Sequence, residues 1–252
     1  METDPAHGRL SGWRFLVTRP REQAQALAQA LERAGGEAVV FPTIELGPPP
    51  TWAPFDAAVG RLSTYAWIVF SSPSAVRFAF GRAPALPTLL GGGGRPAVAA
   101  VGTETAKTLA TYGVAAVVPD DQRQEGLIHA LADLKAGASV LFPQAVGGRE
   151  TLREALERGG VRVDVVPVST TAALPLRGPP PPFDVATFAS PSALRAFIGA
   201  LGAGALAKST VAVIGPTTAA AAREAGLAVH VMAPTPSVAA LVSALCAYLP
   251  PR

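Results

Sequence analysis

The sequence has little of what metal and redox sites need. Its 252 residues include one cysteine, Cys246, and three histidines, His7, His129 and His230, which lie far apart along the chain. A single thiol cannot form an intrachain disulfide, and ligands this scattered lack the spacing of a zinc or iron–sulfur site. The sequence therefore predicts no metal and no disulfide scaffold.

Charge and long apolar runs are also scarce. Charged residues make up 15% of the chain, and 21 Lys and Arg against 18 Asp and Glu leave a net charge of +3. A net charge this small produces only a weak electrostatic field, which argues against a nucleic-acid partner. The first twelve residues contain no apolar stretch that would mark a signal peptide, and the Ala-rich segment Val211–Ala222 is too short to span a membrane. We expect a soluble, cytoplasmic protein that binds neither nucleic acid nor membranes.

Apolar residues, glycine and proline are abundant instead. Hydrophobic residues make up 49% of the chain, which excludes disorder as its global state. The 25 glycines and 25 prolines cluster in short runs that mark loops between compact elements. The length corresponds to one or two domains.

Three pairs of segments relate the first half of the chain to the second. Leu31–Gly35 with Val40–Pro42 recurs as Leu156–Gly160 with Val165–Pro167, Phe70–Arg77 recurs as Phe188–Arg195, and Val98–Ala106 recurs as Val211–Ala219. The first match needs no gap, and all three follow one another in the same order. Collinear matches of this kind predict two similar lobes.

Each repeat has the same composition: a short apolar run, a turn of small polar residues, and then a segment with helical period. Apolar rather than alternating strands are typical of parallel sheets that are covered on both faces. The sequence thus predicts an α/β fold with two similar doubly wound, flavodoxin-like lobes. Ligand sites in such lobes lie at the carboxyl ends of the strands.

The predicted turns between strands and helices carry the chemical signal. Ser72 and Ser190 each precede a proline, which places the serine at a helix N-cap and the proline at the first helical position. The turns at Gly102 and Gly215 should leave backbone N–H groups and threonine hydroxyls free at helix starts. Any one of these turns could be an ordinary cap. Six together would line a cleft with hydrogen-bond donors, which suits a large polyanion.

Other motifs have weaker support. Gly202–Ala207 has the spacing of a dinucleotide fingerprint but follows a predicted helix rather than a strand, and Gly91–Gly94 reads better as a flexible connection than as a phosphate loop. His129 and Cys246 fit packing positions in helices better than catalytic ones. No Ser-His-Asp or Cys-His arrangement is supported.

Five segments together resemble the uroporphyrinogen-III synthase family of tetrapyrrole biosynthesis: Thr18–Pro20, Val69–Val76, Val101–Ala106, Phe188–Ala193 and Ile214–Ala219. The resemblance runs from about Phe15 to Leu245. It implies two lobes that are joined by a two-stranded antiparallel linker. Residues 38–46 and 162–171 would form the linker, residues 1–37 and 172–252 a discontinuous lobe, and residues 47–161 the second lobe.

The resemblance also implies a reaction. Members of the family cyclise hydroxymethylbilane, a linear tetrapyrrole with eight carboxylates, to uroporphyrinogen III with loss of water and inversion of ring D, on the way to haem, sirohaem and cobalamin. No cofactor is implied. The substrate loses its hydroxyl readily, so positioning and electrostatic stabilisation of a cationic azafulvene suffice. This would explain why the predicted turns contain almost no acids or bases.

The family's site threonines correspond to Thr105 and Thr218, which the internal repeat also relates. We expect them to hydrogen-bond the substrate or its departing hydroxyl. The resemblance and the turn chemistry together indicate a wider set of substrate-binding residues: Arg19, Ser71, Ser72, Gly102, Thr103, Ser190, Ser192, Gly215 and Thr217.

This chain departs from the family at one position. Many members carry a tyrosine in the second linker strand as a proposed acid, where this sequence has Ser169. Either Ser169 or Thr170 places a water there, or the tyrosine is dispensable because the leaving group departs easily; we favour the second. Ser169 is therefore kept as a catalytic candidate.

A non-catalytic alternative shares most of these features. A two-lobe anion-binding protein of the periplasmic type would have duplicated α/β lobes, a hinge and a polar cleft. The lack of a recognisable signal peptide counts against it. In either case we expect a monomer, because both lobes look complete on their own.

Overall fold

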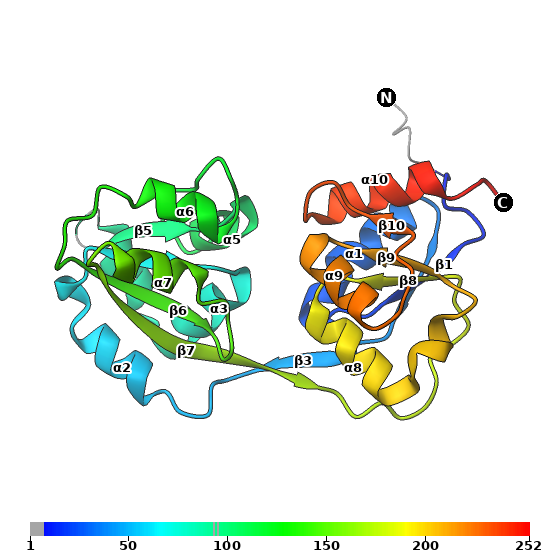
Figure 1. The fold of residues 1–252 in the computed structure, drawn as a ribbon, viewed down its shortest axis with the longest axis horizontal. Helices are drawn as coiled ribbons and strands as arrows, with labels where there is room; N and C mark the ends of the chain where they lie inside the picture. The colour runs from blue at the N-terminus through cyan, green and yellow to red at the C-terminus, as the bar shows by residue number, and fades with distance from the viewer. Residues whose placement is uncertain (1–7, 93, 95) are drawn as a thin grey trace. The chain divides into compact units, whose positions relative to one another are not determined.

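The structure is a computed structural model, described for residues 8–92, 94 and 96–252. The chain divides into two compact units (Figure 1). The first unit combines Met1–Leu46 with Thr171–Arg252, and the second is Gly47–Thr170. The chain therefore passes between the units twice, after Leu46 and after Thr170.

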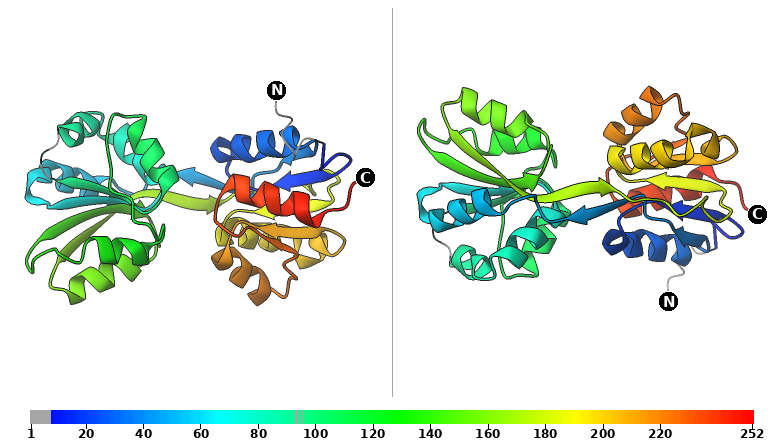
Figure 2. Two further views of the ribbon diagram at one scale, coloured as in Figure 1. Left: turned by 90° about the horizontal axis from the view of Figure 1, so that it is seen from above. Right: turned by 90° about the horizontal axis from the view of Figure 1, so that it is seen from below.

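The first unit is built on a five-stranded sheet of order β10-β9-β8-β1-β2, in which each pairing is parallel. Its strands are β1 (Arg14–Val17), β2 (Glu37–Val40), β8 (Val185–Phe188), β9 (Thr210–Val213) and β10 (Val231–Met232). Its helices are α1 (Arg21–Arg33), α8 (Pro191–Leu201), the 3-10 helix η2 (Ala203–Leu206), α9 (Pro216–Glu224) and α10 (Val238–Tyr248). Successive residues of β1 alternate between two cores, with Phe15 and Val17 in one and Leu16 in the other. Figure 2 shows α1 and α10 on one face of this sheet and α8 and α9 on the other.

The second unit is built on the sheet of order β3-β7-β6-β4-β5. Strands β4 (Trp67–Phe70), β5 (Ala97–Ala100) and β6 (Ser139–Ala145) lie within the unit, whereas β3 (Ile44–Gly47) and β7 (Arg162–Ala173) extend across its boundaries at Gly47 and Thr170. Its helices are α2 (Ala53–Gly60), the 3-10 helix η1 (Leu62–Thr64), α3 (Pro73–Arg82), α4 (Leu86–Gly91), α5 (Thr103–Ala110), α6 (Gln124–Ala130) and α7 (Thr151–Arg158). One core packs under α2, α3 and α5, and the other under α6 and α7. The predicted α/β class with parallel sheets covered on both faces is confirmed.

The repeated segments occupy corresponding places in the two sheets. The parallel pair β1–β2 begins with Arg14 opposite Glu37, and the parallel pair β6–β7 begins with Ser139 opposite Arg162. The helices between these strands, α1 and α7, are each followed by a glycine with positive φ: Gly35 at 93° and Gly160 at 78°. Only glycine adopts this conformation without strain, which explains why the repeat keeps it.

The structure corrects the expectation that residues 38–46 form one strand. β2 ends at Val40 and pairs with β1 inside the first unit, and β3 begins at Ile44. Pro42 has no N–H to donate to a ladder, and the hydroxyl of Thr43 turns inward to the carbonyl of Ala193 at 2.9 Å. By contrast, β7 runs unbroken through the predicted 162–171.

Two negative findings apply to the residues that the structure describes. Within them no helix is long and apolar enough to cross a membrane. The same residues contain no group of three or more His, Cys, Asp or Glu side chains that could hold a metal ion.

Arg252 contacts two residues at the amino-terminal edge of the first sheet, Trp13 and Asp184. The Arg252 guanidinium stacks over the Trp13 ring, 3.4 Å from its centroid, and its Nη1 lies 3.1 Å from Asp184 Oδ1. The other carboxylate oxygen of Asp184 accepts the backbone N–H of Arg14 at 2.9 Å. Burial alone would raise the pKa of Asp184, but the hydrogen bonds from Arg14 and Arg252 outweigh it and hold the pKa below its ordinary value.

Arg252→Ala should lower the free energy of unfolding by about 1 kcal/mol, the combined size of an exposed cation–π contact and a surface ion pair. Because the Asp184 pKa is lower in the folded than in the unfolded chain, its contribution is present above the ordinary value of 3.8 and is lost as the pH falls through the lowered pKa. Urea unfolding at pH 7 and pH 3 measures both effects, with the exposed Arg177→Ala as control. A difference from wild type that is as large at pH 3 as at pH 7 would contradict the role of Asp184.

Candidate functional site

Two threonine hydroxyls form hydrogen bonds between β1 and β8 at the carboxyl edge of the first sheet. Thr18, directly after β1, donates its hydroxyl to the carbonyl of Thr187 at 2.8 Å, and Thr187 donates its own hydroxyl to the carbonyl of Leu16 at 2.8 Å. Both side chains are buried. These bonds fix the positions at which the turns leave β1 and β8.

Arg19 stands in the first of these turns with an unusual set of partners. Its Nη2 donates to Gln23 Oε1 at 3.3 Å, whereas its Nε is buried without a hydrogen-bond partner. Burial lowers the pKa of the guanidinium from its ordinary value. No ion pair to Arg19 occurs within the described part of the chain. The turn thus holds a partly buried cation without a carboxylate partner.

The two predicted serine caps are confirmed. Ser190 Oγ accepts the N–H of Ala193 at 3.2 Å at the start of α8, and Ser72 Oγ accepts the N–H of Ala75 at 3.2 Å at the start of α3. Their backbone angles are nearly identical, with φ of −157° at both. Ser71, beside Ser72, is half-buried, and Ser192 is exposed on α8. The cap serines therefore already use one acceptor position each on their own helices.

The two family threonines lie one turn into their helices. α9 begins after Gly215, whose backbone is extended, and α5 begins after Gly102. Thr218 is 2% exposed and Thr105 is 4% exposed, whereas their neighbours Thr217 and Thr103 are exposed. Both threonines are therefore largely buried in the first turns of their helices.

The expectation of free N–H groups at the Gly102 turn is wrong for Thr103. The backbone N–H of Thr103 donates to Gln122 Oε1 at 3.0 Å. The same side chain lies over Gly102, where an added Cβ would meet Gln122 Oε1 at 3.3 Å. An amide oxygen from the loop before α6 therefore occupies one donor of the α5 N-terminus.

Glutamines at the strand ends of the second unit were missed in the sequence. Besides Gln122, Gln124 is buried and accepts the N–H of Leu152 at 3.2 Å in the first turn of α7. Gln144, near the end of β6, is 4% exposed. The available signal was their position, since each follows or ends an apolar segment.

Ser169 lies on β7 beside the end of β6. Its carbonyl accepts the N–H of Val146 at 2.8 Å, and the β6–β7 register shifts between Gln144 and Ala145 to reach it. The side chain is 2% exposed. The hydroxyl of the neighbouring Thr170 donates to the carbonyl of Pro48 at 3.0 Å. The structure thus places Ser169 near the carboxyl end of the second sheet.

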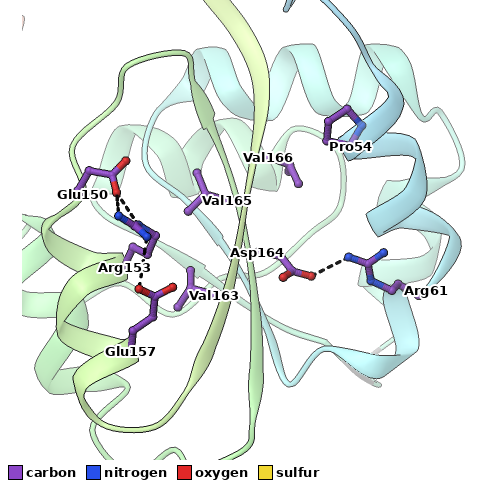
Figure 3. Close-up of a pocket in the computed structure, with 9 residues that line it drawn as sticks. All are labelled: Pro54, Arg61, Glu150, Arg153, Glu157, Val163, Asp164, Val165 and Val166. Carbon is purple, nitrogen blue, oxygen red and sulfur yellow. Dashed lines mark hydrogen bonds and ion pairs between the residues drawn. The ribbon is translucent and has the colours of Figure 1, made fainter.

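A groove of about 600 Å³ runs along the outer edge of β7 in the second unit (Figure 3). Arg61 Nη2 lies 2.8 Å from Asp164 Oδ2, which also accepts the hydroxyl of Tyr65 at 2.5 Å. Burial and the carboxylate raise the pKa of Tyr65 to about 12. On the opposite wall Arg153 pairs with Glu150 and Glu157. The groove contains none of the predicted site residues, and its ionic groups are paired with one another.

Comparison with known proteins gives one family. The family described as uroporphyrinogen-III synthase HemD matches residues 25–243. The uroporphyrinogen-III synthase of Chlorobaculum parvum is 30% identical over 231 residues, which are 86% of this chain and 91% of that protein. The enzyme of the same name from Synechococcus elongatus is 33% identical over 63% of this chain, and the match spans 60% of that protein's length.

Solved structures show the same fold. A mutant uroporphyrinogen III synthase from Thermus thermophilus has a TM-score of 0.62 at 17% identity, over 93% of this chain and 97% of that one. Uroporphyrinogen-III synthetase from Helicobacter pylori also has a TM-score of 0.62, at 19% identity over 93% of this chain and 98% of that one. Because the family match includes the turns of both units from Ser71 to Thr218, the chain belongs to the uroporphyrinogen-III synthase HemD family.

Proposed function

We propose that this chain closes hydroxymethylbilane to uroporphyrinogen III, with loss of water and inversion of ring D. The observation that carries the proposal is the family match over residues 25–243, which includes the strand-end turns from Ser71 to Thr218. Those turns offer hydroxyl and backbone N–H donors, and the turn after β1, which precedes the matched range, adds the Arg19 cation. This chemistry suits carboxylates and a developing charge better than proton transfer. The chain would therefore act mainly by positioning the substrate for ring closure.

We further propose that the two units are duplicated flavodoxin-like lobes. The order β2-β1-β8-β9-β10 is the 2-1-3-4-5 order of that fold. In the second unit β7-β6-β4-β5 has the same arrangement in space, with β6 and β7, the last strands of that unit in the sequence, in the places of strands 1 and 2, and with Val117 bridging to Ala99 in the place of the last strand. The lobes would be the two units as the structure divides them, residues 1–46 with 171–252 and residues 47–170, because residues 38–40 belong to β2 and residues 162–169 pair with β6. The cytoplasmic monomer expected from the sequence belongs to the same proposal.

The roles of the threonines follow from their placement. Thr218 and Thr105, largely buried in the first turns of their helices, would hydrogen-bond the substrate or its departing hydroxyl through the small part of each residue that stays exposed. The turns around them would bind acetate and propionate groups. Ser169 would at most order a water, because a buried aliphatic hydroxyl is a poor acid.

One experiment separates this enzyme from a non-catalytic anion-binding protein. Hydroxymethylbilane closes unaided to the symmetrical isomer, so the purified chain is incubated with it and the two isomers are separated after oxidation. An enzyme yields the inverted isomer at a rate proportional to its concentration. A binding protein leaves the isomer ratio of the uncatalysed reaction, and that result would reject the proposal.

Thr218→Ala should lower kcat/KM for the inverted isomer by about tenfold or more, the value of one hydrogen bond with a charged partner. Ser169→Ala should stay within about threefold of wild type, because it removes only a neutral contact. Thr108→Ala, on the exposed side of α5, is the control, with circular dichroism to check folding. If the Ser169 variant is folded but inactive while the Thr218 variant is unaffected, β7 carries the chemistry instead.

Ser72→Ala and Ser190→Ala should affect stability more than rate. Each removes a helix cap that the structure shows in use, at a cost of about 1 kcal/mol in free energy of unfolding. The rate loss at a temperature where both variants are folded should be modest, because other donors share the carboxylates. Urea unfolding and steady-state assays on the same samples check this. Full stability with a large loss of rate would mean that the serines act on the substrate directly.

A further inference from the structure

Each sheet has a switch point, where the connections that follow two neighbouring strands run in opposite directions along the sheet. In the first sheet this switch point lies between β1 and β8, and in the second between β6 and β4. Ligands of open α/β sheets bind at such points. The registers that start at Arg14 and Ser139 make Arg19 and Gln144 counterparts, since each is the fifth residue after the start. The same place thus holds a cation in one unit and a neutral amide in the other.

Arg19 carries a charge that its surroundings do not balance. Nε is buried without an acceptor, and Nη2 has only the neutral Gln23 amide at 3.3 Å. A buried cation with no counter-ion is costly to folding, and a buried N–H with no acceptor adds to the cost. Such a group calls for an explanation, and an absent anionic ligand is one that accounts for both the charge and the orphaned donor.

Gln144 is neutral and therefore needs no counter-ion. Gly148 packs so closely against it that an added Cβ would come within 2.3 Å of Gln144 Oε1. The loop after β6 therefore closes over a neutral side chain. The other strand-end turns, residues 71–72, 102–105, 189–190 and 215–218, contain no Lys or Arg. Among these four turns and the turn after β1, Arg19 alone supplies a positive charge; the loop after β6 also contains Arg149, which is exposed and lies five residues beyond Gln144.

We propose that Arg19 is the charge anchor of the site, binding one carboxylate of the substrate, and that Gln23 is its positioning residue. The inference rests on the proposed function. The planar guanidinium presents paired donors that match a carboxylate, which a lysine ammonium does not. Gln23 Oε1 occupies one of them and limits the rotation of the group. The anchor makes recognition unequal between the units: one switch point attracts an anion from a distance, and its counterpart offers only a neutral contact.

Arg19→Gln tests the anchor by giving the first unit the amide of the second. Its matched control is Arg21→Gln, which removes the same charge from an exposed side chain two residues away. Steady-state kinetics with hydroxymethylbilane at low and high salt, and urea unfolding, are measured on both. We expect the KM of Arg19→Gln to rise by about tenfold to a hundredfold with kcat within about twofold, the pattern of a lost charge-assisted contact. The salt dependence of kcat/KM should weaken, and stability should be unchanged or higher.

Two further variants refine the test. Arg19→Lys keeps the charge but loses the paired donors, so its KM should lie between those of wild type and Arg19→Gln. Gln23→Ala should raise KM by less than Arg19→Gln and leave kcat unchanged.

A KM for Arg19→Gln within about twofold of wild type, or equal to that of the control variant, would overturn the anchor while the proposed function stands. A destabilised or unfolded Arg19→Gln would also overturn it, since that result marks a structural residue. Failure of the wild-type chain to form the inverted isomer would overturn the proposed function itself, together with the anchor that rests on it.

Discussion

Every helix that follows a parallel strand begins with N–H groups that have no partner within the helix, and the organisation of this protein depends on how each of those groups is satisfied. Three helices use a serine at the N-cap: α3, α8 and α10. Two others use a glutamine side chain from elsewhere: Gln122, in the loop before α6, accepts an N–H of α5, and Gln124, the first residue of α6, accepts an N–H of α7. The helix starts at Gly215 and after Arg19 have no side-chain cap. Some helix starts are thus satisfied by side chains of the protein, and others are not.

Much of this arrangement could be predicted from the sequence, because its causes are local. A serine followed by a proline fixes a helix start by short-range geometry, and both predicted caps are in place. Parallel sheets follow from apolar strands that alternate with helices. The first repeated segment spans the ends of α1 and β2 in one unit and the corresponding parts of α7 and β7 in the other, but the sequence assigned β2 and β7 to a linker and did not predict that they pair with β1 and β6.

The rest depends on contacts between residues far apart in the sequence. Gln122 accepts the N–H of Thr103, nineteen residues earlier in the chain, and neither segment has a sequence pattern that predicts this hydrogen bond. To predict the break between β2 and β3 from the sequence, one would need to know that the hydroxyl of Thr43 donates to the carbonyl of Ala193, 150 residues away. For Arg19, the sequence and the family resemblance indicated a binding residue, but its lack of a counter-ion could be seen only once its neighbours were in place. The site residues themselves stay predictions.

The discontinuity of the first unit has a consequence for synthesis on the ribosome. The central strands β1 and β8 are neighbours, yet the threonines that tie them, Thr18 and Thr187, are 169 residues apart. The second unit, Gly47–Thr170, is contiguous and can close while β8 is still untranslated. Until then β1 can pair with β2, but its other edge stays open and Phe15 and Leu16, both fully buried in the finished protein, lack the rest of their sheet. The nascent amino-terminal segment therefore presents an open apolar strand edge throughout the translation of the second unit, and there a chaperone would protect the chain.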